Sequence, residues 1–208
     1  MNKSAIVLAG GSSIRFGQDK GVLSLGNKPL IQHAIDAVRP LVDEVIVVTR
    51  SQERIAQYAK LLPYDVRFAV DVYGQNSPLV GALTGFGVAG GKYALLVGFD
   101  MPFISVDVAS LLFDLCADKT AVIPRWPNGQ IEPLHSVYQT KIALAASKSA
   151  VSEGTLDMLN MIENLLGVRY VSTLVLQQLD PDYRTFFSVN SPVDLKKAAA
   201  MLKPRRTK

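Results

Sequence analysis

Short apolar runs rich in β-branched residues recur along the first part of the chain. They are SAIVLA at 4–9, EVIVVT at 44–49, DVRFAV at 65–70, KYALLVGF at 92–99 and TAVIP at 120–124. Each run has the length of one strand, and most runs are apolar on both faces, as in parallel strands that are covered on both sides. Helical patterns separate the runs. This alternation predicts a doubly wound α/β fold, in which a mostly parallel sheet carries helices on both faces.

The pattern changes after Pro124. RWPNGQ contains an Asn-Gly pair and predicts a turn, in which Trp126 either stacks on a ligand ring or packs against its own turn. The segments that follow are expected as three strands (IEPLHSVYQ, VRYVST and RTFFSVN) and three helices (TKIALAASKSAV, GTLDMLNMIENLL and SPVDLKKAAAMLK). The chain has no internal repeat and no low-complexity linker. We therefore expect residues 1–208 to form a single domain around one continuous sheet.

The net positive charge of the chain comes from its end. The formal net charge is +4, and the last six residues, KPRRTK at 203–208, carry four cations and no acid. The rest of the chain is therefore formally neutral, and a sequence pI of about 9.2 does not indicate nucleic-acid binding. We expect 203–208 to be a flexible basic tail.

Cysteine content and the N-terminal residues bear on location. The single Cys116 excludes an internal disulfide and any cysteine-rich metal site. The first apolar run is too short for a signal peptide or a membrane span. These observations favour a cytoplasmic protein without a membrane partner.

A glycine-rich stretch, LAGGSSIRFGQDKG, begins at Leu8, directly after the first apolar run. Glycines allow close approach of the backbone, and bare N–H groups can hold phosphate oxygens. Arg15 can make a forked contact to phosphate, and Lys20 supplies a point charge. The stretch matches neither the P-loop pattern nor G-x-G-x-x-G, so neither a P-loop NTPase nor a Rossmann dehydrogenase is indicated. The alternative is an ordinary glycine-rich surface loop.

Two carboxylates follow predicted strands, at the edge where open α/β sheets bind ligands. Asp100 comes after LLVGF and is followed by Met-Pro, which directs the chain out of the sheet. A single carboxylate at this point suits Mg²⁺, which keeps several waters and also binds substrate phosphates. Asp71 ends the third run, and its two acceptor oxygens match the N1–H and N2–H₂ donors of guanine. As a lone residue, Asp71 could equally be a solvated loop acid.

Together these stretches resemble the molybdenum cofactor guanylyltransferase (MobA-like) family of nucleotidyltransferases. The family's opening pattern, L-A-G-G-x-S-x-R-M-G-x-D-K, corresponds to residues 8–20, with Phe16 in place of methionine, and K-P-L-I follows at 28–31. The family's D-x-P-[FY], P-L-x-G and N-T-P-x-[DE]-L correspond to DMPF at 100–103, PLVG at 78–81 and NSPVDL at 190–195. The sequence departs from the family pattern near Thr49, where the family often has an asparagine.

The resemblance implies a Rossmann-like nucleotidyltransferase fold. It also implies transfer of GMP from GTP to the terminal phosphate of molybdopterin cofactor, with release of pyrophosphate. The implied catalytic residues are Arg15, Lys20 and Asp100, with Asp100 as the Mg²⁺ ligand. The implied nucleotide-binding residues are Leu8, Ala9, Gly10, Gly11, Lys20, Asp71 and Asp100. The residues expected to face the second substrate are Asn190, His135 and Gly81.

Two other functions remain open. The chain could be a guanylyl- or cytidylyltransferase that acts on another phosphorylated metabolite, although Gly10, where related cytidylyltransferases tend to have alanine, favours guanine. It could also be a catalytically silent nucleotide-binding protein. The expected partners are GTP and molybdopterin cofactor, with transient contact to molybdoenzymes or their chaperones, and the expected assembly is a monomer or weak oligomer.

Overall fold

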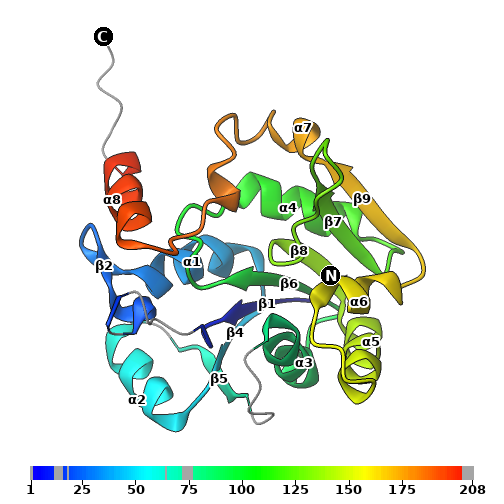
Figure 1. The fold of residues 1–208 in the computed structure, drawn as a ribbon, viewed down its shortest axis with the longest axis horizontal. Helices are drawn as coiled ribbons and strands as arrows, with labels where there is room; N and C mark the ends of the chain where they lie inside the picture. The colour runs from blue at the N-terminus through cyan, green and yellow to red at the C-terminus, as the bar shows by residue number, and fades with distance from the viewer. Residues whose placement is uncertain (1, 12–15, 18, 64, 72–76, 203–208) are drawn as a thin grey trace.

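The computed structural model describes residues 2–11, 16–17, 19–63, 65–71 and 77–202. Within these residues a seven-stranded sheet, in the order β5-β4-β1-β6-β8-β7-β9, runs through the centre of the molecule (Figure 1). Its strands are β1 (Lys3–Leu8), β4 (Glu44–Thr49), β5 (Arg67–Val70), β6 (Tyr93–Gly98), β7 (Ala121–Arg125), β8 (Ser136–Gln139) and β9 (Val168–Ser172). A separate pair is formed by β2 (Ser24–Leu25) and β3 (Lys28–Pro29).

Helices connect the strands. The α-helices are α1 (Leu30–Val38), α2 (Gln52–Leu61), α3 (Pro78–Val88), α4 (Val106–Leu115), α5 (Thr140–Ser152), α6 (Met158–Glu163), α7 (Thr173–Leu176) and α8 (Pro192–Met201). The 3₁₀-helices are η2 (Lys20–Val22), η3 (Arg39–Leu41) and η4 (Arg184–Phe186). None of the helices in the described part of the chain is long and apolar enough to cross a membrane.

The strand directions confirm the predicted fold class. β5, β4, β1 and β6 are parallel, and Ala5 of β1 lies opposite Val45 on one side and Leu95 on the other. β8 is antiparallel to both β6 and β7, and β9 returns parallel to β7. The carboxyl ends of β1, β4, β5 and β6 therefore meet at one edge of the sheet, where a site is expected.

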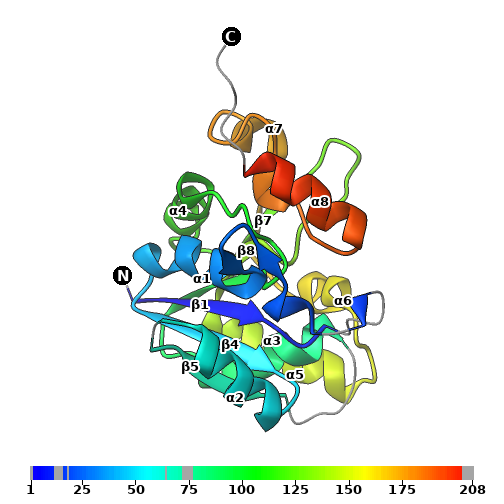
Figure 2. The ribbon, with the colours of Figure 1, turned by 90° about the vertical axis from the view of Figure 1, so that its left-hand side faces the viewer.

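Two apolar layers cover the sheet because side chains alternate along each strand. Ala5 and Val7 of β1 point into a core shared with α1 and α4, whereas Ile6 and Leu8 point into a core shared with α3, α5 and α6. Figures 1 and 2 show these two sets of helices on opposite faces of the sheet. All four of these apolar side chains are buried, as the prediction of a strand covered on both faces requires.

The second half of the chain departs from the expected strands. RTFFSVN is not a strand, so that prediction is wrong; the segment begins with η4. Its backbone N–H groups do not bond to a neighbouring strand. Thr185 N–H donates to Asp180 Oδ2 at 2.6 Å, and Val189 N–H donates to the Asp100 carbonyl at 2.9 Å. In IEPLHSVYQ only β8 pairs regularly, because Pro133 offers no N–H and its carbonyl accepts from Tyr138 Oη.

His135 is enclosed between β8 and the C-terminal segment. Its side chain is fully buried, its Nε2 lies 3.0 Å from Thr185 Oγ1, and its ring contacts Phe186 edge to face at 5.2 Å. Burial lowers the pKa of His135 from 6.5 to about 4. The imidazole is therefore neutral in the folded protein at neutral pH.

This burial predicts a pH-dependent stability. Below pH 6.5 the unfolded chain binds a proton at His135 and the folded protein does not. The contribution of His135 to the free energy of unfolding is therefore fully present above pH 6.5 and is lost as the pH falls toward 4. The contribution of this one group to the slope reaches about 1.4 kcal/mol per pH unit. Urea unfolding of the wild type and of His135→Gln between pH 7 and pH 4.5 measures it. The free energy of unfolding should depend less steeply on pH in the variant, by the amount that corresponds to uptake of about one proton. Equal slopes in the two proteins would contradict the prediction.

Candidate active site

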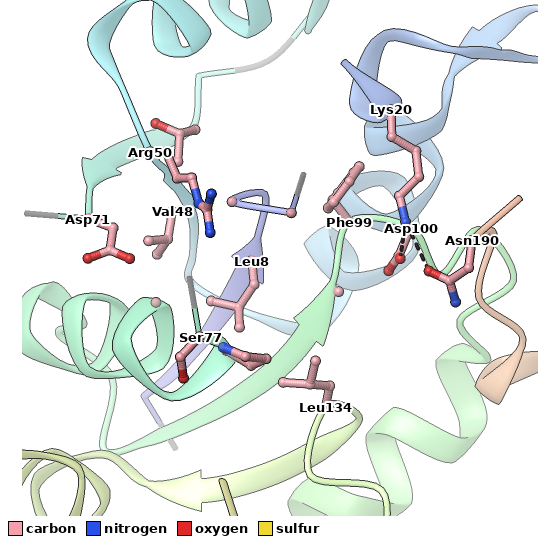
Figure 3. A pocket seen from close by; sticks show the side chains of 16 residues that line it. Leu8, Lys20, Val48, Arg50, Asp71, Ser77, Phe99, Asp100, Leu134 and Asn190 are labelled. Atoms are coloured by element: carbon pink, nitrogen blue, oxygen red, sulfur yellow. Dashed lines mark hydrogen bonds and ion pairs between the residues drawn. The ribbon is translucent and has the colours of Figure 1, made fainter. Parts of the chain in front are cut away.

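A pocket of about 330 Å³ lies at the carboxyl ends of the parallel strands (Figure 3). Its lining comes from segments far apart in the chain. The lining residues are Leu8, Gly10, Gly11, Lys20, Val48, Thr49, Arg50, Asp71, Ser77, Pro78, Gly81, Gly98, Phe99, Asp100, Leu134 and Asn190. Four of these segments follow the ends of β1, β4, β5 and β6, which is why the fold brings them together.

One end of the pocket holds a buried ion pair. Lys20 Nζ lies 2.6 Å from Asp100 Oδ2 and 3.1 Å from Asn190 Oδ1. Lys20 is only 8% exposed, and its ammonium also lies 5.2 Å from the centroid of the Phe99 ring. Because a buried ammonium needs a charged or polar partner, the Asp100 carboxylate and the Asn190 amide hold Lys20 in the pocket.

The backbone around Asp100 makes room for its carboxylate. Gly98 is the last residue of β6, and a Cβ added there would lie 2.6 Å from Asp100 Oδ1. The Asp100 carbonyl accepts a hydrogen bond from Val189, which places Asn190 beside the ion pair. Asn190 N–H in turn donates to Asp194 Oδ2 at 3.1 Å, in the first turn of α8.

The opposite end of the pocket contains Asp71. This residue follows β5, and its N–H donates to the Thr49 carbonyl at 2.7 Å. Thr49, where the family often has asparagine, is fully buried and donates its hydroxyl to the Ser51 carbonyl at 3.2 Å. Arg50 instead extends across the pocket between Asp71 and the Lys20 end (Figure 3). Sequence reasoning assigned no role to Arg50.

Most of the predicted site residues meet in this pocket. Those that line it are Leu8, Gly10, Gly11, Lys20, Asp71, Gly81, Asp100 and Asn190. Arg15 lies outside the described residues, so its predicted phosphate contact stays a prediction. The described residues include no group of three His, Cys, Asp or Glu side chains that could bind a metal by themselves. A metal held here would therefore share Asp100 with ligands from a substrate.

Two expected contacts, those of Ala9 and His135, are not supported by the structure. The Ala9 backbone is already engaged, because its N–H donates to the Val48 carbonyl at 2.7 Å and its carbonyl accepts from Arg54 Nη1 at 3.1 Å. His135 does not reach the pocket, which its neighbour Leu134 lines instead. Of the two alternatives for Trp126, the structure favours packing. Its ring centroid lies 5.0 Å from that of Tyr183, its Nε1–H donates to Glu132, and it does not line the pocket.

Comparison with known proteins gives a consistent picture. A family model described as the MobA-like NTP transferase domain matches residues 5–165. A probable molybdenum cofactor guanylyltransferase from Methanosarcina acetivorans is 32% identical over 203 residues, which covers 93% of this chain and 88% of that protein. A molybdenum cofactor guanylyltransferase from Desulfosudis oleivorans is 28% identical over 204 residues, which covers 98% of this chain and 97% of that protein.

Solved structures agree with these matches. The crystal structure of molybdopterin-guanine dinucleotide biosynthesis protein A from Archaeoglobus fulgidus has a TM-score of 0.81 at 26% identity, covering 95% of this chain and 97% of that chain. The 2-C-methyl-D-erythritol 4-phosphate cytidylyltransferase from Thermus thermophilus, at 17% identity, shares the fold with a TM-score of 0.70 over 97% of this chain and 98% of that chain. Because the family model spans most of the sequence and the pocket gathers most of the family's motifs, this chain belongs to the MobA-like NTP transferase family.

Proposed function

We propose that this chain transfers GMP from GTP to the terminal phosphate of molybdopterin cofactor and releases pyrophosphate. The observation that carries the proposal is the convergence of Lys20, Asp100 and Asn190 at one end of a pocket whose other end holds Asp71. Such a transfer needs a cation that binds phosphate, a carboxylate that binds the metal and a carboxylate that recognises the base. Lys20, Asp100 and Asp71 would supply these groups. The names of the relatives in M. acetivorans, D. oleivorans and A. fulgidus support the same substrates.

Asp71 would select the base. Its carboxylate offers two acceptor oxygens, which match the adjacent N1–H and N2–H₂ donors of guanine. Cytosine lacks this pair of donors. The Asp71 N–H is already bonded to Thr49, so the backbone holds the carboxylate at the pocket wall.

The reaction needs charge neutralisation more than proton transfer. The acceptor phosphate has a second pKa of about 6 and is largely dianionic at neutral pH, so no general base is required. Lys20 and the backbone of Gly10 and Gly11, which line the same pocket, would hold the triphosphate and stabilise the departing pyrophosphate. Asn190 would orient the acceptor.

Asp100 would bind Mg²⁺ together with the phosphates of GTP. The donor chemistry fits, because a single carboxylate oxygen donor in a polar pocket suits an ion that keeps several waters. A bound Mg²⁺ would neutralise phosphate charge and orient the groups that react. In the structure the positive charge facing Asp100 is the Lys20 ammonium.

An assay of pyrophosphate release tests the function. Purified protein with Mg²⁺ and molybdopterin cofactor should release pyrophosphate with GTP and not with CTP, ATP or UTP. Preference for CTP would contradict the assignment of Asp71. Release with GTP and a different phosphorylated metabolite, but not with molybdopterin, would favour the alternative acceptor. Binding of GTP without any release would favour the silent nucleotide-binding protein.

Asp100→Asn tests the metal site. The variant keeps an oxygen beside Lys20 but loses the charge that binds Mg²⁺, so transfer should fall by about 100-fold or more. Titration with Mn²⁺ in the presence of GTP, followed by electron paramagnetic resonance, should show weaker metal binding. Asp107→Asn is the matched control, because Asp107 is exposed on α4 and does not line the pocket. Equal metal affinity in Asp100→Asn and the control would remove the metal role from Asp100.

A further inference from the structure

Arg54 of α2 contacts the glycine-rich loop on both sides, although it does not line the pocket. We call 9–11 the first stem of the loop and 19–21 the second stem. Its Nη1 donates to the Ala9 carbonyl at 3.1 Å and to the Gly11 carbonyl at 3.4 Å. Its Nε lies 3.1 Å from Asp19 Oδ2. One guanidinium thus joins the residues before and after the segment that includes Arg15. The side chains of Arg54 and Asp19 are 23% and 11% exposed, so solvent screens this pair only partly.

The other carboxylate oxygen of Asp19 is also held by hydrogen bonds. Asp19 Oδ1 accepts hydrogen bonds from Gly21 N–H at 2.7 Å and from Tyr58 Oη at 2.8 Å. Tyr58 is fully buried, and burial together with the nearby Asp19 charge raises its pKa well above the usual range, so the phenol remains a donor. A Cβ at Gly21 would overlap the Tyr58 hydroxyl, so only glycine allows this approach.

The contacts on the first stem have an electrostatic consequence. An anion cradle must present N–H groups, because carbonyl oxygens carry partial negative charge and repel phosphate. The carbonyls of Ala9 and Gly11 flank Gly10, and both are bonded to Arg54. Gly10 and Gly11 themselves line the pocket. Arg54 therefore holds these two carbonyls outside the place where phosphate would bind.

The contacts on the second stem fix the lysine. Lys20 lies between Asp19 and Gly21, and both neighbours are bonded through the Asp19 carboxylate. The backbone of Lys20 is thereby set, and its ammonium reaches Asp100 at 2.6 Å. If Asp19 were released, the Lys20 side chain would have to find its place without this support.

We propose that Arg54 is a positioning residue that shapes both walls of the triphosphate cradle, namely the backbone at Gly10–Gly11 and the ammonium of Lys20. The inference rests on the proposed function, because it takes the anion in the pocket to be a nucleotide triphosphate. It assigns to Arg54 no contact with the substrate. Its effect on the polyphosphate end should exceed its effect on the base end at Asp71.

Calorimetric titrations with GTP and with tripolyphosphate, and saturation-transfer NMR with guanosine, separate the two ends. Arg54→Ala should weaken the binding of GTP and of tripolyphosphate by about tenfold or more, because the loop loses several charge-assisted hydrogen bonds. Binding of guanosine should not change. Arg54→Lys keeps the charge but loses the forked guanidinium, so its affinity for GTP and tripolyphosphate should lie between those of the wild type and Arg54→Ala. This variant replaces Arg54→Ala in the test if the alanine variant does not fold.

Arg67→Ala is the matched control. Arg67 also bonds a carbonyl, that of Val88 at 2.6 Å, and lies 3.7 Å from Glu44 Oε2, but it is at the opposite end of β5 from the pocket. A purely structural role for Arg54 would lower the melting temperature as in the control while leaving the affinity for tripolyphosphate unchanged, and that result would overturn the inference alone. A wild-type protein that binds no GTP would overturn the proposed function and this inference with it.

Discussion

The ion pair between Lys20 and Asp100 is the interaction on which the pocket depends. It joins residues that are 80 positions apart, and the Asn190 amide, which accepts from Lys20, lies 170 positions after Lys20 in the chain. An isolated buried ion pair seldom adds to stability, because both ions must leave water. Added stability alone therefore does not account for the pair. Lys20 and Asp100 are the two charges that a triphosphate and its metal would engage.

The sheet and its loops supply the support for this pair. The parallel arrangement of β1 and β6 sets the ends of the two strands side by side, so that the glycine-rich loop and Asp100 meet. Gly98 leaves space for the carboxylate, and the bond from Val189 to Asp100 brings the C-terminal segment to the same place. Arg54 and Tyr58 hold Asp19 on the other side. The geometry of the pocket thus follows from backbone contacts as much as from side chains.

Sequence patterns predicted the elements that depend on local order. The strand-length apolar runs are confirmed, as is the placement of Asp71 and Asp100 at strand ends. Other features depend on contacts between residues far apart in the chain, which local patterns do not reveal. RTFFSVN has strand-like residues but no strand to pair with, and burial of His135 depends on a segment about 50 residues away. The contacts of Arg54 with Ala9 and Asp19 are not visible in any local spacing.

The proposed function requires the Lys20 ammonium to bind the triphosphate of GTP. Titration of GTP into Lys20→Met tests this requirement, because methionine keeps an apolar stem and removes the charge. Lys28→Met is the control, since Lys28 also forms a 2.6 Å ion pair, with Asp36, outside the pocket. Lys20→Met should remain folded and bind GTP about tenfold or more weakly than the control. Equal affinity for GTP in the two variants would rule out this role of Lys20.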